Sequence, residues 1–587
     1  MLAIDKKKKE KTYSEIIDDS YKTDEGLFTV HSKNDKFLYE ISPDLLGKEM
    51  LMVTRIAKTA NGIGYGGQKI NSQVLRWQKK HDKILLRIVS YENVASDTLP
   101  ISKSVKNSNF EPVLYSFDIK TYNPSDSSVV IDVAPLFKTD VKALGFPQYR
   151  RKSLKITSLD KKRSFIESIK SFPINIEARS VMTYNSSEPP SLRNSQTISL
   201  EINNSMLLLP ENKMQPRLRD QRVGFFSQSQ TDYGLDEQKA KSTTYIRRWK
   251  LVPKDIEAYN RGELVEPIKP IIYNIDPSTP KKWRKYLKQG VDDWQVAFEA
   301  AGFKNAIIGK YSPTEEEDSD WTPEDARYSV MRYYASDIQN AYGPHTADPR
   351  TGEILESDIG WYHNVMNLLR NWYMIQTAAV NETSRDVKFD DEVMGQLIRF
   401  VSAHEVGHTI GLQHNMGSSS AYPVDSLRSP FFTSSHGVAP SIMDYARFNY
   451  VAQPGDGVTN FYPMVGTYDI WAIKWGYTYF DGESTKSEQK LLNEWIKSHS
   501  GDYEYWFGYS NGIDPRSQTE SIGDDNMMAS FYGIQNLKRI LPKLLEWSYE
   551  EGKNYDDLKE LYLNVNSQFR RYIGHVSTNV GGVFEDL

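Results

Sequence analysis

The pattern of apolar and polar positions changes character along the chain. From residue 27 to about residue 251, short alternating runs rich in β-branched and aromatic residues predict strands. The strand candidates are residues 27–31, 37–41, 84–89, 113–119, 129–133, 177–184 and 197–209, with one helical stretch near 161–171. We therefore expect a β-rich N-terminal domain over residues 27–253.

Residues 254–480 alternate short apolar runs with helical periodicity. A helix that ends at Gly302 is predicted where apolar residues recur every three or four positions, at Trp283, Leu287, Val291, Trp294 and Phe298. Further strand candidates are 271–275, 328–334 and 354–361, and residues 365–380 form another helix candidate. This alternation predicts a mixed sheet backed by helices.

The two ends of the chain differ from the middle. After residue 480 the pattern turns helical, with candidates at 486–499, 528–549 and 555–573, so we expect a helical C-terminal region over 481–587. Residues 1–26 contain a lysine run at 6–9, and no apolar stretch follows that would make a signal peptide. We expect a disordered basic tail there, and an α+β multidomain fold for the whole chain.

Composition excludes several classes of function. The net charge of −5 over 587 residues gives no basic surface for nucleic acid. Cysteine is absent, which excludes disulfides, thiolate zinc ligands and a cysteine nucleophile. No apolar run reaches the length of about 18 residues needed to span a membrane. Composition does not determine the oligomeric state.

The residues that indicate chemistry lie in one segment, 404–414, with the sequence HEVGHTIGLQH. His404 and His408 continue the apolar stripe of a helix that begins near residue 390, and their four-residue spacing lets both imidazoles reach one cation. Gly411 is expected to end the helix in a left-handed conformation and so to redirect His414 toward the same cation. Three histidines and one open position are typical of catalytic zinc.

Glu405 follows the first of these histidines and projects about 100° around the helix from it. A carboxylate there is suited to accept a proton from zinc-bound water. One histidine alone would more often be a satisfied core residue, but the combined pattern favours a metal site. Met443, in the segment 441–445, would by itself be an ordinary core methionine.

Together these motifs resemble the metzincin clan of zinc endopeptidases. The resemblance implies that His404, His408 and His414 are ligands, that Glu405 is the general base and that Met443 is the Met-turn methionine. It also implies a metal-binding and transition-state role for Tyr445, although a buried structural tyrosine would fit that position too. The residue after the third histidine is Asn415, where several metzincin branches have Asp, Glu, Ser or Thr.

Much of the chain is also similar to large zinc-dependent metalloproteases of Bacteroides-like bacteria. The similar segments are residues 224–227, 247–249, 343–345, 403–418 and 444–448. The similarity implies a metzincin-like catalytic domain at 254–480 preceded by the β-rich domain, and an extracytoplasmic location: secreted, periplasmic or at the cell surface. Members of that family continue past the end of this chain, so we expect a shortened C-terminus.

Three weaker features have ordinary alternatives. His345, Asp348 and His363 have a spacing loosely like a second, structural metal site, or are exposed loop residues. The acidic residues 315–325 are either a solvated loop or calcium ligands, although no calcium-loop pattern is met. Residues 352–361 are expected to form the strand against which an extended substrate pairs.

The leading hypothesis is therefore a zinc metalloendopeptidase with one catalytic Zn²⁺ that acts on protein or peptide substrates. Glu405 favours this enzyme over a zinc-containing binding or adhesion protein, which would have no use for that residue. A zinc hydrolase acting on non-peptide amides or glycans is a third hypothesis. If the chain is latent, the blocking ligand must be Asp, Glu or His, because there is no cysteine.

Overall fold

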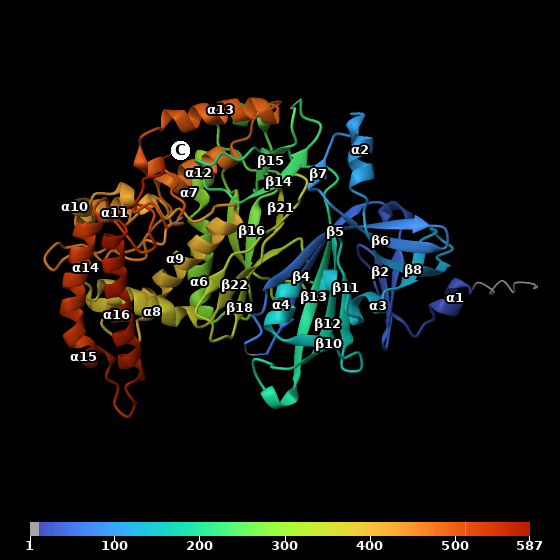
Figure 1. Cartoon of the computed structure of the whole chain (residues 1–587), viewed down its shortest axis with the longest axis horizontal. Helices are drawn as coiled ribbons and strands as arrows, with labels where there is room; N and C mark the ends of the chain where they lie inside the picture. The colour runs from blue at the N-terminus through green and yellow to red at the C-terminus, as the bar shows by residue number, and fades with distance from the viewer. Residues whose placement is uncertain (1–10, 61, 237, 511, 587) are drawn as a thin grey trace, which may run out of the picture. The chain divides into compact units, whose positions relative to one another are not determined.

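The computed structural model describes residues 11–60, 62–236, 238–510 and 512–586 (Figure 1). The chain divides into two compact units. The first comprises Met1–Lys213, Ser229–Thr243 and Trp321–Arg327, and the second comprises Met214–Gln228, Thr244–Asp320 and Tyr328–Leu587. The α+β fold class is confirmed, with a β-rich N-terminal region and a helical C-terminal region. The domain boundaries expected at 253/254 and 480/481 stay predictions.

The first unit is built on a 12-stranded sheet of order β1-β2-β3-β9-β8-β6-β5-β4-β13-β12-β10, with β11 also paired to β12. Its strands are β1 Lys22–Asp24, β2 Thr29–Lys33, β3 Lys36–Ile41, β4 Glu49–Lys58, β5 Lys69–Lys80, β6 Lys83–Val89, β8 Val113–Tyr122, β9 Val129–Asp132, β10 Ile156–Leu159, β11 Phe165–Ser171, β12 Asn175–Ser186 and β13 Thr197–Leu208. The helices are α1 Tyr13–Ile16, α2 Ile101–Ser108, α3 Ala134–Lys138 and α4 Gln148–Ser153. A separate small sheet has the order β15-β14-β7, formed by Lys241–Ile246, Ser227–Asp232 and Asn93–Val94.

Aromatic side chains fill the core of the first unit. The fully buried Trp77 has ring centroids 5.9 Å from Phe28, 6.3 Å from Tyr39 and 5.6 Å from Phe117. The contacts with Phe28 and Tyr39 are edge-to-face, a geometry that adds to the stabilisation given by the buried area itself. The alternating pattern of the N-terminal half thus forms an apolar core.

Two segments of this unit differ from the expectation. The helical periodicity near 161–171 was misleading: the segment is strand β11, and a bulge between Ile166 and Ser168 interrupts its two-residue period. Of the expected basic tail, residues 1–10 lie outside the described residues. Residues 11–26 contain α1 and β1, and β1 pairs with β2 through Thr23 and His31.

The second unit contains a five-stranded mixed sheet of order β17-β16-β18-β22-β19. Its strands are β16 Ile271–Ile275, β17 Ile307–Tyr311, β18 Ser329–Tyr334, β19 Ala341–Tyr342 and β22 Ile359–Tyr362. All neighbours are parallel except β19, which runs antiparallel to β22. Strands β20 Thr346–Ala347 and β21 Ile354–Glu356 form a separate antiparallel pair.

The second unit also contains the longest helices of the described residues. Its helices are α5 Ile256–Asn260, α6 Lys281–Asp292, α7 Gln295–Ala300, α8 Val365–Thr377, α9 Asp391–Thr409, α10 Val424–Leu427, α11 Pro430–His436, α12 Thr467–Tyr477, α13 Thr485–Ser498, α14 Asn526–Ile540, α15 Leu544–Ser548 and α16 Asp556–Ser577. Figure 1 shows α14 and α16, both red, lying side by side. Among the described residues, no helix is both long and apolar enough to cross a bilayer.

The predicted helix over 283–298 is two helices rather than one. Its five apolar positions are all buried, but α6 ends at Asp292 and α7 starts at Gln295. The break falls at Trp294, whose indole donates a hydrogen bond of 2.8 Å to Ala403 O on α9. Helix α6 approaches α9 so closely that a Cβ on Gly290 would lie 2.5 Å from the Ser402 Cβ. These contacts fix the position of α9 within the unit.

Candidate metal centre

Helix α9 carries the first two predicted ligands on its last two turns. Side chains from distant segments donate hydrogen bonds to the carbonyls at its C-terminal end. The Trp249 indole donates to Thr409 O at 2.9 Å, and the Tyr477 hydroxyl donates to Ile410 O at 2.7 Å. Since the last carbonyls of a helix lack partners within it, these donors stabilise the helix end. Residues 247–249, singled out by resemblance alone, thus help to hold the end of α9.

A glycine turn follows and directs the third histidine back. Gly411 has φ of +106°, and a Cβ there would lie 2.2 Å from Arg247 O, so only glycine fits without strain. The turn is held by strand-like hydrogen bonds, with Phe226 N donating to Gly411 O and Gln413 N to Gly224 O, both at 2.7 Å. Residues 224–226 therefore support the turn that carries His414.

The structure brings His404, His408 and His414 together. One ring nitrogen from each lies within 4.8 Å of the others. The Nε2 atom of His414 is 3.3 Å from His404 Nε2 and 3.0 Å from His408 Nε2. The predicted ligand triplet thus converges on a single point.

The hydrogen-bond partners of the Nδ1 atoms show which nitrogen of His404 and of His408 carries the proton. His404 Nδ1 lies 2.8 Å from Ile442 O, and His408 Nδ1 lies 2.8 Å from Leu412 O. A carbonyl only accepts, so each Nδ1 carries the proton of the neutral ring and each Nε2 presents a bare lone pair. Both lone pairs face His414 Nε2, which carries at most one proton and so cannot satisfy both of them as a donor, whereas a cation between the three nitrogens would be bound by all of them. The donor set therefore fits a metal ion that prefers imidazole, such as zinc.

Electrostatics keep the three imidazoles neutral. Burial lowers the pKa of His408 to about 4, and burial with the nearby His408 and Arg447 lowers that of His414 to about 3. Burial also lowers the pKa of His404. Since a histidine must be unprotonated to bind a metal, the rings are ready to do so at neutral pH.

Met443 packs against helix α9 next to His408. It is fully buried, and a Cβ on Gly407 of α9 would lie 2.2 Å from its Sδ. Its carbonyl accepts a hydrogen bond from Asn415 N at 3.1 Å, next to the third histidine. The turn around Met443 is anchored by Asp469, whose carboxylate accepts hydrogen bonds from Ser441 Oγ at 2.6 Å and Ile442 N at 2.7 Å.

Glu405 is a buried carboxyl group beside the triplet. Burial raises its pKa to about 7, although a hydrogen bond from the Gly343 amide acts in the opposite direction. Gly343 packs against the base so tightly that a Cβ there would lie 2.4 Å from Glu405 O and 3.1 Å from Glu405 Oε2. The segment 343–345, also singled out by resemblance, therefore contacts the predicted base.

Tyr445 lies against the ligand rings. Its ring centroid is 4.3 Å from that of His414 and 5.3 Å from that of His404. The Tyr445 ring also contacts Arg447, a residue to which the sequence motifs gave no role. The Arg447 Cζ is 4.0 Å from the Tyr445 ring centroid and 3.7 Å from that of Trp372, so the guanidinium is stacked between the two rings.

The weaker metal candidates do not form clusters. Within the part of the chain that the structure describes, His404, His408 and His414 make the only group of three or more possible ligands. His345 Nδ1 lies 3.2 Å from His408 O, His363 Nδ1 lies 2.6 Å from the Tyr333 hydroxyl, and Asp348 forms an ion pair with Arg350. The acidic residues 315–325 likewise give no cluster, and calcium has no support there.

The expected substrate strand also has a different place. Strand β22 has β18 on one side and β19 on the other, through Ala341 paired with Trp361 and Tyr342 paired with Gly360. The expectation that residues 352–361 provide the open edge is therefore wrong for β22. On this side the sheet ends at β19, the short antiparallel segment at 341–342, and its other edge strand is β17.

Comparisons with known families agree with the geometry. Residues 386–586 match a family model described as Met-zincin. Residues 67–254 and 10–59 match two models described as domains of unknown function, DUF5117 and DUF5118. No curated protein and no solved structure matches the chain. The expected relationship to the metzincins is thus confirmed by the match and by the histidine triplet, and residues 386–586 form a Met-zincin domain.

Proposed function

We propose that the chain is a zinc-dependent endopeptidase that hydrolyses peptide bonds, with Glu405 as general base. The observation that carries this proposal is the convergence of three neutral imidazoles beside a buried carboxyl group. Three protein nitrogens leave a fourth position of a tetrahedral zinc site open, which is the arrangement of catalytic rather than structural zinc. A bound Zn²⁺ would polarise the substrate carbonyl and acidify a water molecule.

Glu405 supplies proton transfer in this proposal. Its carboxylate accepts a proton from the attacking water and delivers it to the leaving amine of the cleaved bond. A carboxyl group whose pKa is raised by burial is well matched to this exchange near neutral pH, because it both gains and loses the proton readily. The Gly343 amide holds this side chain in place.

Tyr445 and Arg447 complete the site. In this proposal the Tyr445 phenol donates a hydrogen bond to the oxyanion that develops on the substrate carbonyl, and the contact of its ring with His414 supports that role. Arg447 acts through Tyr445 as a positioning residue, because its guanidinium lies on the ring face opposed to Trp372. Its nearest carboxylate, that of Glu520, is 3.8 Å away.

A zinc-binding protein without hydrolytic activity is the competing function. Burying a carboxyl group without full pairing costs stability, so a site that needed zinc only for shape would gain nothing from Glu405. The same chain shows the contrast, since buried Glu40 is held by hydrogen bonds from His31, Asn123 and Tyr13. Glu405 therefore favours the enzyme.

The test combines zinc content with peptide hydrolysis for three proteins: the native chain, Glu405→Gln and Glu353→Gln. Glu353 is a matched control, because burial also raises its pKa and it is not part of the triplet site. We expect zinc in all three proteins and hydrolysis in the native chain and Glu353→Gln, with a loss of about 10²–10⁴-fold in Glu405→Gln. Equal activity in native and Glu405→Gln proteins would refute the general base, and a zinc-loaded but inactive native chain would favour the binding function.

An extracytoplasmic location is part of the same proposal. It rests on the resemblance to exported bacterial metalloproteases. Fractionation of cells that express the full-length protein tests it, with recovery outside the cytoplasm as the expected result and recovery only with cytoplasmic proteins as the contrary one.

A further inference from the structure

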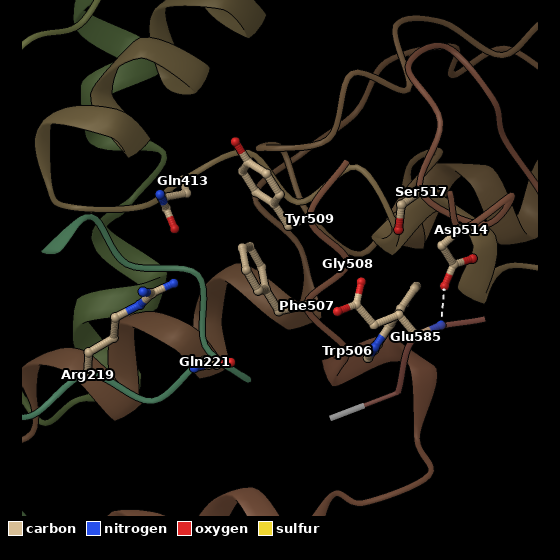
Figure 2. Close-up of a pocket in the computed structure, with 10 residues that line it drawn as sticks. All are labelled: Arg219, Gln221, Gln413, Trp506, Phe507, Gly508, Tyr509, Asp514, Ser517 and Glu585. Carbon is tan, nitrogen blue, oxygen red and sulfur yellow. Dashed lines mark hydrogen bonds between the residues drawn. The ribbon is translucent and has the colours of Figure 1, made fainter. Parts of the chain in front are cut away.

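A pocket of about 290 Å³ adjoins the loop that carries the third histidine (Figure 2). Its lining includes Arg219, Gln413, Phe507, Tyr509 and Glu585. Gln413 directly precedes His414, and consecutive Cα atoms are about 3.8 Å apart, so the pocket begins one residue from the metal centre. Nothing in the proposed chemistry uses this pocket.

Asn415 joins the pocket wall to the metal centre. Its side-chain amide donates to Trp506 O at 2.9 Å, and its side-chain oxygen accepts from Gly508 N at 2.8 Å. The backbone adds a hydrogen bond from Gly417 N to Gly508 O at 3.0 Å. Asn415, the residue that departs from the usual metzincin types, thus ties residues 506–508 to the ligand loop, so the pocket has a defined position relative to the third histidine.

Some of the charged side chains around the pocket form close ion pairs and others do not. Asp514, which also lines it, is neutralised by Arg516 at 2.7 Å, and Asp220 beside the pocket is paired with Arg222 at 2.7 Å. Within the described residues, the exposed Arg219 forms no ion pair within 4 Å and no side-chain hydrogen bond, although its charge contributes to lowering the pKa of the neighbouring Asp220. Figure 2 shows the Arg219 side chain extending toward Gln413, with the Glu585 carboxylate on the other side of Phe507. The end of the pocket lined by Gln413 therefore carries a positive charge, that of Arg219, which no close ion pair neutralises.

We infer that this pocket is a substrate subsite for an acidic side chain, with Arg219 binding its carboxylate. The inference rests on the proposed peptidase function. Phe507 and Tyr509 offer aromatic surface for the methylene groups of a glutamate, and the fork of donors on arginine matches a carboxylate. Glu585 repels a carboxylate at the far end, and Arg219 repels a basic side chain at the near end. The site thus selects both for an acidic residue and for its orientation.

The position of the pocket limits which substrate residue it takes. An extended substrate advances about 3.3 Å per residue. Because the pocket starts at the residue before a metal ligand and extends away from it, the acidic residue lies within a few positions of the cleaved bond. The structure predicts a preference at one position rather than a general attraction to acidic proteins.

The test uses pairs of peptides that differ only by Glu or Gln at one position within four residues of the cleaved bond. They are assayed with the zinc-loaded native chain, with Arg219→Gln, and with Arg261→Gln as a control. Arg261 is also an exposed arginine of the second unit but does not line the pocket. At one position, native and Arg261→Gln proteins should prefer Glu by about tenfold in kcat/KM, and Arg219→Gln should show a ratio near one. A ratio unchanged by Arg219→Gln, or near one in the native chain at every position, would overturn the subsite.

Calorimetric binding of the same peptides separates failure of the subsite from failure of the proposed function. If the native chain cleaves none of them, the peptidase proposal fails, and binding decides about the pocket. Tighter binding of a Glu peptide that is lost in Arg219→Gln supports the subsite. Equal binding of Glu and Gln peptides refutes it. Arg219→Glu should shift the preference toward a lysine peptide.

Discussion

His31 in the first unit and His408 in the second are both largely shielded from solvent, but their ring nitrogens have different hydrogen-bond partners. His31 Nδ1 lies 2.9 Å from Thr23 Oγ1 and its Nε2 lies 3.0 Å from Glu40 Oε2, so both nitrogens have polar partners. His408 Nδ1 has a carbonyl partner, whereas its Nε2 faces the ring nitrogen of another predicted ligand, His414 Nε2, at 3.0 Å. Burial alone therefore does not identify a metal ligand. The convergence of three imidazole nitrogens does.

The glutamates of the two regions show the same contrast. Burial raises the pKa of Glu40, but hydrogen bonds from His31, Asn123 and Tyr13 outweigh it, and the pKa ends below its usual value. For Glu405, burial dominates and raises the pKa to about 7. The first region satisfies its buried acid, whereas the second keeps one poised to exchange a proton.

The largest expected effect distinguishes the two histidines. His408→Ala should lower zinc affinity by more than the roughly 10–100-fold typical of losing a hydrogen-bond partner of a ligand, and should abolish hydrolysis. His31→Ala should retain zinc and activity and lose about 1–3 kcal/mol of stability, because Glu40 loses a buried partner. Metal analysis and thermal unfolding measure both. Zinc loss in His31→Ala, or full zinc in His408→Ala, would erase the distinction.

A smaller loss is expected where the backbone approaches the base. Gly343→Ala places a Cβ against Glu405, and displacing the base should lower kcat by about 100-fold while zinc content stays unchanged. Gly574→Ala is the matched control, since a Cβ there meets nothing within 4 Å in helix α16. It should leave activity intact and add about 0.5–1 kcal/mol of stability. Equal activity of the two variants would remove Gly343 from the account.

Loss of Arg447 should lower kcat by about tenfold. A desolvated cation stacked on an aromatic ring is worth up to about 2 kcal/mol, so Arg447→Met should lower kcat by about tenfold with little change in KM, and Arg447→Lys should restore part of it. If Arg447 acts through Tyr445, Arg447→Met should add nothing to Tyr445→Phe in a double-mutant cycle. Additive losses would mean that Arg447 acts independently of that ring.

The pH dependence of stability should have opposite signs at the two glutamates in zinc-free protein. The folded-state pKa of Glu405 is raised, so the stability that this group contributes is lost as pH rises from about 4.5 to about 7. Over that range the free energy of unfolding of Glu405→Gln should increase by a few kcal/mol relative to that of the native chain. The folded-state pKa of Glu40 is lowered, so its contribution of about 1 kcal/mol is lost as pH falls below about 4.5. Urea unfolding of the native chain, Glu405→Gln and Glu40→Gln between about pH 3 and 8 measures this. Parallel curves would contradict it.

Local periodicity predicted much of the fold. The apolar stripe from Trp283 to Phe298 appears as two helices because its side chains pack on one face, and the run at 271–275 appears as strand β16, which is buried on both faces. Strands β4 and β5 were missed, although both lie inside the main sheet. In β4, residues 50–54 are buried on both faces, so the alternation that marks a half-exposed strand is absent. The break at Trp294 depends on a contact with Ala403, which local pattern does not contain.

The same limit applies to the site. His404, Glu405, His408 and His414 share one short segment, so helical spacing and one glycine were enough to bring them into a single prediction. Gly343, Trp372 and Arg447 reach the site from other elements through tertiary contacts. For Gly343 and Arg447 the only signal in the sequence was family resemblance around 343–345 and 444–448, which marked the segments without giving a role, and Trp372 had no such signal.

X-ray absorption at the zinc edge of the loaded native chain tests the central claim most directly. With one zinc per chain, the spectrum should show three imidazole nitrogens at about 2.0–2.1 Å and one additional oxygen. A shell made mainly of oxygen atoms, or one unchanged by His408→Ala, would contradict the three-histidine centre.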